Sequence, residues 1–335
     1  MNLFNLSQDS LSRILEFMEG SSFYLYTHLL LKYKNILDLN ELKCYDYYKA
    51  SELTKRSPIF KRSICSLYID VDLDDKILKS LINLKSIYIL SRPINKYIDP
   101  NVTELGPINK YIGPNVTELG VVDYAWYDFK KGFENIKVLK CINTGINNIS
   151  PNIETLALEM CDLQLMNLNK GLKSLTLIKS KSLTDRVMTD ISKLKRLEHL
   201  HIGPRFNLNF IPTCITSLHL QNSSAGSNNF TKLKKLKKLK LENWSCKNLR
   251  GVISKLTSIE LLHCNGYTGQ CINRFKNAKY IVIKHCKNFN PKNLKIGDDA
   301  FMSISDCENF NPTSIKIKNI DNLLIKNCLK FNGLN

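Results

Sequence analysis

The feature that most constrains this chain is a short segment that recurs near its C-terminal end. Ile281 to Phe289, Met302 to Phe310 and Leu323 to Phe331 superpose without a gap, each 21 residues after the last. A fixed period of this length is typical of a solenoid, in which similar units stack in one dimension. The chain has 335 residues, more than the roughly 250–300 at which a single round core stops growing. Length and period therefore both favour a stack of repeats.

The same frame continues toward the N-terminus as the apolar pattern L-x-x-L-x-L. Residues of a β-strand point alternately to opposite faces, so the last two apolar residues of the pattern point into the coil and the residue between them faces outward. One unit cannot bury its apolar side alone, so the units are predicted to stack into a parallel sheet. The central apolar residues of these earlier units are Leu67, Ile87, Leu119, Leu139, Leu156, Leu175, Leu200, Leu218, Leu239 and Ile259.

The pattern resembles the leucine-rich-repeat family over most of the chain. Residues 161, 264, 286, 307 and 328 are cysteines, at the turn position where that family has Asn or Cys. The cysteine-containing subtype is typical of F-box/leucine-rich-repeat proteins. Phe206 to Leu220 also resembles the related FNIP repeat, known from social amoebae and from giant viruses that infect amoebae. The resemblance implies an α/β solenoid, a leucine-rich-repeat stack with a parallel sheet, over residues 63–335. Cysteines at this buried turn are expected to pack, rather than to form disulfides or bind zinc.

Residues 1–62 lack the repeat and are predicted to be helical. Ser7 is a suitable N-cap, and Leu11, Ile14, Leu15 and Met18 lie on one face of a helix. The segment is similar to the opening of an F-box, although Ser7 stands where that motif usually has proline. The likeness implies a small N-terminal helical F-box-like segment that binds a Skp-type adaptor of a cullin complex. A helical cap for the first repeat is the alternative. The adaptor-binding residues would be Leu6, Leu11, Ile14, Leu15 and Met18.

A second, shorter repeat covers residues 93–120. Pro93 to Gly106 recurs as Pro107 to Gly120 with one change, Asp99 to Gly113. At 14 residues the copy is shorter than a structural unit, so it indicates a tandem duplication of coding sequence. It predicts a tighter or irregular unit near Val102.

The outward face of the predicted sheet is the expected binding surface. The residue after each central position faces outward, and this column runs Tyr68, Tyr88, Gly120, Lys140, Ala157, Thr176, His201, His219, Lys240, Glu260, Val282, Ser303 and Leu324. Its middle part is basic, although Glu260 on the following unit opposes the charge. A three-histidine metal site is the sharper alternative for the histidines, but no metal is expected because no carboxylate or cysteine completes it. The predicted substrate-binding residues are His199, His201, His219, Lys238 and Lys240.

The formal net charge of +18 favours a partner with acidic or phosphorylated groups. A coding bias toward Lys, Asn and Ile is the alternative explanation of the charge. Nucleic acid is not the expected partner, because the repeats lack aromatic columns for stacking bases. No membrane segment is expected, and eleven cysteines without a secretory signal favour the cytoplasm, a host cytoplasm for a viral chain, with the nucleus left open. No catalytic motif is present, so neither enzymatic activity nor a cofactor is expected.

Two functions follow from the repeats and the resemblance. The first is the substrate receptor of a cullin-type ubiquitin ligase, with repeats that bind a protein substrate and N-terminal helices that bind the adaptor. The alternative is a leucine-rich-repeat binding protein that recruits no ligase. Both are protein–protein interaction scaffolds.

Overall fold

The computed structural model of the chain divides into two compact units, Met1–Ile153 and Glu154–Asn335. The residues that the structure describes are 45–47, 66–70, 81, 84–90, 112–113, 115–122, 127–130, 132–161, 168–179, 185–203, 208–221, 228–244, 249–250, 255–267, 277–289, 297, 299–308, 310 and 322–328.

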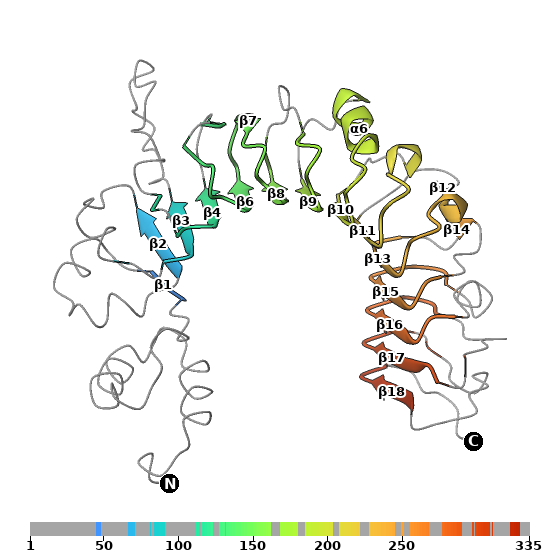
Figure 1. The fold of residues 1–335 in the computed structure, drawn as a ribbon. Coiled ribbons are helices and arrows are strands. Elements are labelled where there is room, and N and C mark those ends of the chain that lie inside the picture. Colours follow the sequence, from blue (N-terminus) through green and yellow to red (C-terminus); the bar gives the residue numbers. More distant parts are fainter. Residues whose placement is uncertain are drawn as a thin grey trace, which may run out of the picture. The chain divides into compact units, whose positions relative to one another are not determined.

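The first unit is built on a parallel sheet in which each strand pairs with the next one along the chain or the next but one (Figure 1). The strands of this sheet are β1 (Tyr45–Tyr47), β2 (Ser66–Asp70), β3 (Ser86–Leu90), β4 (Glu118–Val122) and β6 (Val138–Ile142). A separate parallel pair is formed by β5 (Tyr127–Phe129) and β7 (Ile146–Ile149). Because β1 pairs with β2, the sheet begins before residue 63, inside the segment predicted to be helical.

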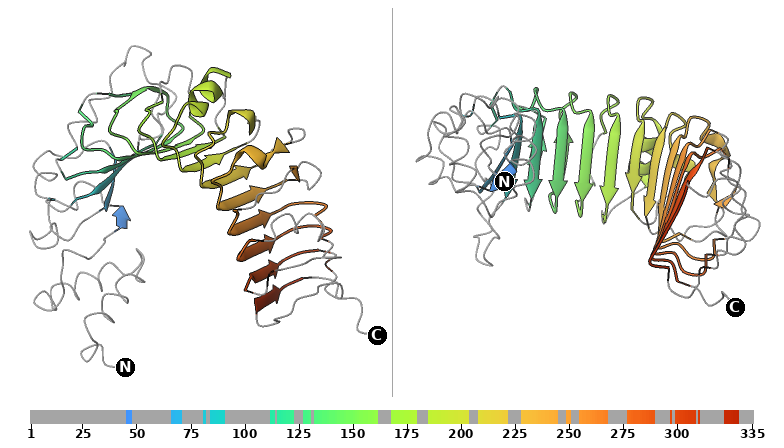
Figure 2. Two further views of the ribbon diagram at one scale, coloured as in Figure 1. Left: turned by 45° about the vertical axis from the view of Figure 1, so that its right-hand side comes forward. Right: turned by 90° about the horizontal axis from the view of Figure 1, so that it is seen from below.

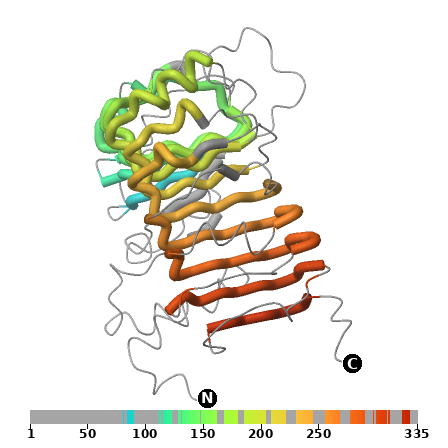
Figure 3. The backbone as a smooth tube through the Cα atoms, turned by 90° about the vertical axis from the view of Figure 1, so that its right-hand side faces the viewer, coloured from blue at the N-terminus to red at the C-terminus, as the bar shows by residue number. Residues whose placement is uncertain are grey.

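The second unit continues the same plan with a longer parallel sheet, and its rungs lie above one another in Figure 3. Its strands are β8 (Thr155–Glu159), β9 (Ser174–Ile178), β10 (His199–Ile202), β11 (Ser217–Gln221), β13 (Lys238–Glu242), β15 (Ser258–Leu262), β16 (Tyr280–Lys284), β17 (Phe301–Ser305) and β18 (Leu323–Lys326). On the return side of the rungs lie helix α6 (Asp185–Ser192), the 3-10 turns η4 (Leu208–Phe210) and η5 (Phe230–Lys232), and the strand pair β12 (Asn228–Asn229) and β14 (Leu249–Arg250).

The predicted repeat frame is the register of the sheet. Leu200 pairs with Leu175 on one side and with Leu218 on the other, and the next central residues, Leu239 and Ile259, follow in line. All five are at most 2% exposed. Strand residues alternate between buried and partly exposed. The strands of the second unit run parallel to one another (Figure 2). The fold is therefore a parallel-sheet solenoid of the leucine-rich-repeat type, as the sequence predicted.

Most of the described rungs turn away from the strand through a residue in the left-handed backbone region. His263 has a φ of 50°, and its N–H donates to the carbonyl of Lys284 at 3.0 Å. That carbonyl belongs to the last residue of the neighbouring strand, so the turn also joins two rungs. The same conformation occurs at Asn143, Met160, Lys179, Asn243, His285, Asn288, Asp306 and Asn327.

A buried cysteine follows this turn residue in the last rungs of the second unit. Cys264, Cys286 and Cys307 are fully buried thiols, in no disulfide. The thiol of Cys264 donates to the carbonyls of Leu262 and Leu241 at 3.2 and 3.4 Å. The contact with Cys264 raises the pKa of Cys286 to about 12, so this thiol stays protonated. The predicted packing role of these cysteines is confirmed.

The duplicated segment adds no strand between β3 and β4. These two strands pair directly, with Ile87 opposite Leu119. The second copy supplies β4, whereas Val102 in the first copy lies outside the described residues. No helix within the described part of the chain is long and apolar enough to cross a membrane.

Candidate functional site

The outward face of the second sheet carries a continuous column of side chains. Pairing places His201 beside Thr176 and His219, and His219 beside Lys240. Glu260, Val282, Ser303 and Leu324 then follow in register. The structure therefore confirms the order of the column that the repeat frame predicted.

His201 and His219 form a stacked pair in the middle of this face. Their ring centroids are 3.7 Å apart and their planes differ by 13°. Nε2 of His219 lies 3.4 Å from Oε2 of Glu242, which is longer than an ordinary N–H···O hydrogen bond. The Nε2 atoms of both histidines are buried and make no hydrogen bond among the described residues. Such a close stack is suited to two neutral imidazole rings, since two charged rings would repel each other.

Burial and the neighbouring charges keep the pair neutral. Burial lowers the pKa of His219, and the adjacent His201 and Lys240 lower it further, to about 4, against the opposing effect of Glu242. Burial also lowers the pKa of His201. A histidine with an ordinary pKa gains its charge near pH 6.5, whereas His219 does so only near pH 4.

The depressed pKa predicts acid sensitivity. Below about pH 6.5 the unfolded chain binds a proton at residue 219 that the folded chain does not bind until about pH 4. The free energy of unfolding should therefore fall as the pH is lowered from 6.5 to 4. In His219→Gln this part of the pH dependence should disappear, which urea unfolding at several pH values would measure. Equal slopes for both proteins would contradict the prediction.

The rest of the predicted basic patch is partly neutralised. Nζ of Lys240 lies 3.4 Å from Oε2 of Glu260, and an ion pair of this kind reduces the charge available to a ligand. His199 and Lys238 are exposed and lie on either side of Ser217, in the column that precedes the central residues. The five predicted residues do lie together on one face, but Lys238 is the lysine among them that is in no ion pair with a described residue.

An apolar cluster lies further along the same face, on β16, β17 and β18. Tyr280 is 59% exposed, and its register partner Phe301 is 37% exposed. Leu324 on the next strand is 38% exposed and lies opposite the small side chain of Ser303. Sequence reasoning missed this cluster because it followed the column after the central residues, whereas Tyr280 and Phe301 precede them.

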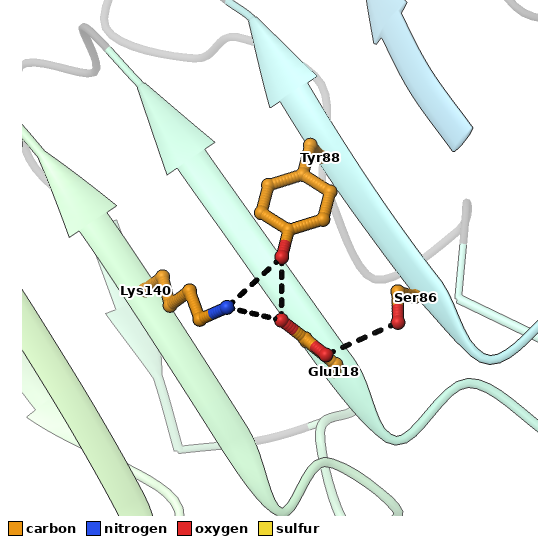
Figure 4. A network of polar contacts seen from close by, with 4 residues as sticks. All are labelled: Ser86, Tyr88, Glu118 and Lys140. Carbon is orange, nitrogen blue, oxygen red and sulfur yellow. Dashed lines mark hydrogen bonds and ion pairs between the residues drawn. The ribbon is translucent and has the colours of Figure 1, made fainter. Parts of the chain in front are cut away.

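The first unit carries a polar network on its own outward face (Figure 4). Glu118 on β4 accepts hydrogen bonds from Tyr88 at 2.5 Å, Lys140 at 2.6 Å and Ser86 at 3.1 Å. Lys140 also donates to the hydroxyl of Tyr88 at 3.1 Å. The Tyr88 ring lies over Gly120, where a Cβ atom would be 2.1 Å from Cδ1 of the ring. The absence of a side chain at residue 120 therefore makes room for the network.

The charges of this network stabilise one another. Burial alone would raise the pKa of Glu118, but the hydrogen bonds from Lys140 and Tyr88 outweigh it and hold the pKa below its usual value. Burial alone would lower the pKa of Lys140, but the hydrogen bond to Glu118 outweighs it and raises the pKa. Both groups are thus fixed in their charged forms and already satisfied, so we assign this network to the stability of the first sheet.

Two predictions from the sequence remain, the adaptor-binding residues and the absence of a metal site. The predicted adaptor-binding residues lie outside the described residues: Leu6, Leu11, Ile14, Leu15 and Met18. Among the residues that are described, no three His, Cys, Asp or Glu side chains are grouped so as to hold a metal ion.

Comparison with known proteins gives likeness at the level of structure. No family model matches the chain. No curated protein matches it either. One similar solved structure is the functional domain of InlJ from Listeria monocytogenes, which includes a cysteine ladder; it is 9% identical with a TM-score of 0.43, over 83% of this chain and 67% of that one. The APL1 leucine-rich repeat domain is 13% identical with a TM-score of 0.35, over 87% and 92% of the two chains. The LRIM1/APL1C complex gives 13% identity and a TM-score of 0.31, over 85% and 63%.

Proposed function

We propose that this protein is a protein-binding scaffold, and that its partner lies on the outward face of the second sheet. The observation that carries the proposal is the exposed cluster of Tyr280, Phe301 and Leu324 on three adjacent strands. Exposed aromatic and aliphatic side chains gathered on a surface that is otherwise polar are typical of protein interfaces, where a few such residues supply most of the binding energy.

The charges around the cluster indicate the chemistry of the partner. Lys284 and Lys326, the last residues of β16 and β18, are exposed and lie at the same register position. Neither lysine is in an ion pair with a described residue. A third lysine, Lys238, lies two strands away from Tyr280 at the same register position. The matching partner is a protein segment in which acidic residues accompany at least one large apolar side chain. This partner agrees with the acidic or phosphorylated substrate that the sequence favoured.

Selection from a display library of random 16-residue peptides tests this proposal. Enriched peptides should combine Asp or Glu with an aromatic or aliphatic residue. A selected peptide should bind Tyr280→Ala/Phe301→Ala at least tenfold more weakly than the wild type, since both anchors are lost. It should bind Lys284→Glu/Lys326→Glu several-fold more weakly, and more weakly as salt increases.

The basic patch provides a matched comparison on the same sheet. Lys238→Glu/Lys240→Glu makes the same change of net charge as Lys284→Glu/Lys326→Glu, but in the middle of the face. Loss confined to this middle variant would place the partner at His199, His201, His219, Lys238 and Lys240, as the sequence predicted, and not at the apolar cluster. Peptides that bind all variants equally would refute binding on this face.

The finer function that we propose is that of a substrate receptor for a cullin-type ubiquitin ligase. The support for it is the likeness of residues 1–18 to the opening of an F-box, followed by repeats. The purified chain should co-elute with a Skp-type adaptor on size exclusion. Leu11→Asp/Leu15→Asp should abolish this while leaving the circular dichroism of the repeats unchanged. If the adaptor never co-elutes, the chain binds its partner without a ligase, and the scaffold proposal is unaffected.

A further inference from the structure

The charge of the second unit is concentrated at the edge where its strands begin. From β9 to β16 each strand is preceded by a buried apolar residue with exposed or partly exposed positions on either side of it, as in Lys234-Lys235-Leu236-Lys237. Leu233 and Leu236 are buried, so Lys234 and Lys235 are held at the surface. Repetition of this plan creates a row of exposed cations, which we name the strand-start edge: Lys170, Lys195, Arg196, Lys234, Lys235, Lys237, Lys255 and Lys279.

Backbone hydrogen bonds align this edge from rung to rung. Lys237 N–H donates to the carbonyl of Thr216 at 2.8 Å, and Thr257 N–H donates to that of Lys237, also at 2.8 Å. Lys279 continues the ladder from Thr257 at 2.8 Å. Within the described residues, no member of the strand-start edge is in an ion pair. Two neighbouring lysines, Lys173 and Lys193, are instead paired, with Glu154 and Asp190.

The opposite edge, where the strands end, differs in charge. Lys179 lies 3.1 Å from Glu159, and Lys287 lies 3.5 Å from Glu308. Lys284 and Lys326 also lie at this edge, in no ion pair with a described residue, but Glu242 and Asp306 balance their charge. A coding bias toward lysine would add cations to both edges alike, so it does not account for this difference.

We propose that the strand-start edge binds the phosphate backbone of double-stranded nucleic acid, as an activity separate from protein binding on the sheet face. From β9 to β16 the edge crosses five strand spacings, or about 24 Å. The edge has eight cations, and the exposed Glu198 lowers its net charge to about +7. Over about 24 Å this is one net positive charge per about 3.4 Å. This equals the spacing of phosphates along one strand of a duplex.

Two further observations favour nucleic acid over an acidic protein. An extended polypeptide advances about 3.4 Å per residue, so it would need an acidic residue at almost every position to match this edge. Protein interfaces also use apolar anchors. From β9 to β15 none of the exposed large apolar side chains among the described residues belongs to the edge, and Tyr280 lies beside Lys279 only at its last strand. Phosphate contacts need only charge and read no sequence. From β9 to β15 the edge carries no aromatic residue for stacking unpaired bases, so a duplex is the better ligand.

Fluorescence anisotropy with labelled 24-base-pair DNA and RNA duplexes tests this inference on the full chain. Two unrelated sequences should bind equally. For contacts to about four phosphates, affinity should fall about a hundredfold between 50 and 200 mM salt. Lys234→Glu/Lys235→Glu/Lys237→Glu should weaken binding at least tenfold and flatten the salt dependence, because each lost phosphate contact lowers the slope by about one.

The control variant reverses three charges elsewhere in the second unit. Lys179→Glu/Arg186→Glu/Lys287→Glu makes the same change in net charge and should bind duplexes within about twofold of the wild type. An equal loss in both variants would show that net charge alone is responsible and would overturn the proposal. So would the absence of binding at 50 mM salt. Poly-glutamate that competes as well as duplex at equal charge would identify an acidic protein as the ligand instead. Circular dichroism melts of both variants show whether the repeats remain folded.

Discussion

Leu218→Ala is expected to lower the free energy of unfolding by about 2–5 kcal/mol, the range for a buried leucine whose loss leaves a cavity. Leu218 is 1% exposed and lies between Leu200 and Leu239 in the register of the sheet. Its neighbours are fixed by backbone hydrogen bonds on both sides, so the rung has little freedom to collapse onto the cavity. Leu200→Ala, at 2% exposure, should have a similar effect. Urea unfolding followed by circular dichroism measures both.

The matched control lies one position away from a buried leucine on the same sheet. Lys238 is exposed and precedes the buried Leu239. Lys238→Ala should change the free energy of unfolding by less than about 0.5 kcal/mol, as most surface substitutions do. If Leu218→Ala were as mild as Lys238→Ala, the assignment of inward and outward faces would be wrong.

Gly120→Ala is expected to destabilise the chain by about 1–3 kcal/mol, as overpacking does in other proteins. The added Cβ atom would lie 2.1 Å from Cδ1 and 2.9 Å from Cγ of Tyr88. Because Cγ is close to the backbone, the ring cannot move aside without leaving Glu118 and Lys140. The substitution therefore removes hydrogen bonds as well as causing a clash. Thermal or urea unfolding gives the difference in stability.

A double-mutant comparison separates the clash from any backbone effect. In the Tyr88→Ala background the ring is absent, so Gly120→Ala should be neutral or slightly stabilising, since alanine limits the unfolded chain more than glycine does. A loss of stability as large as in the wild-type background would mean that the cause is not the contact with Tyr88.

The sequence was sufficient for the repeat frame, and for a physical reason. Buried positions recur with the period of the rungs, so Leu175, Leu200 and Leu218 could be placed in register before the structure was known, and His201 beside His219 followed from them. Position on a face does not determine charge, however. The depressed pKa of His219 depends first on its burial, which the order of the column does not give.

Other features of the structure could not be predicted from the sequence either. The strand β1 has no leucine frame, because Asp46 pairs with Leu67 and so lies where the later strands have leucine or isoleucine. The repeat frame placed Tyr88, Gly120 and Lys140 in one column, but it did not give the hydrogen bonds that Glu118 accepts from Tyr88 and Lys140. The concentration of lysine at one edge became visible only when consecutive rungs were aligned in space.

The turn that links neighbouring rungs also has a consequence for how such a chain can evolve. Its hydrogen bond runs from one backbone N–H to the backbone carbonyl of the next rung, as from His285 to Ser305. Asn, Met, Lys, His and Asp all occupy the turn, so the joint between rungs places little demand on the side chain. Gain or loss of a whole 21-residue rung by recombination would thus leave the remaining joints intact. The binding face would lengthen or shorten in steps of about 4.8 Å, and each step would bring one new set of outward side chains to a partner.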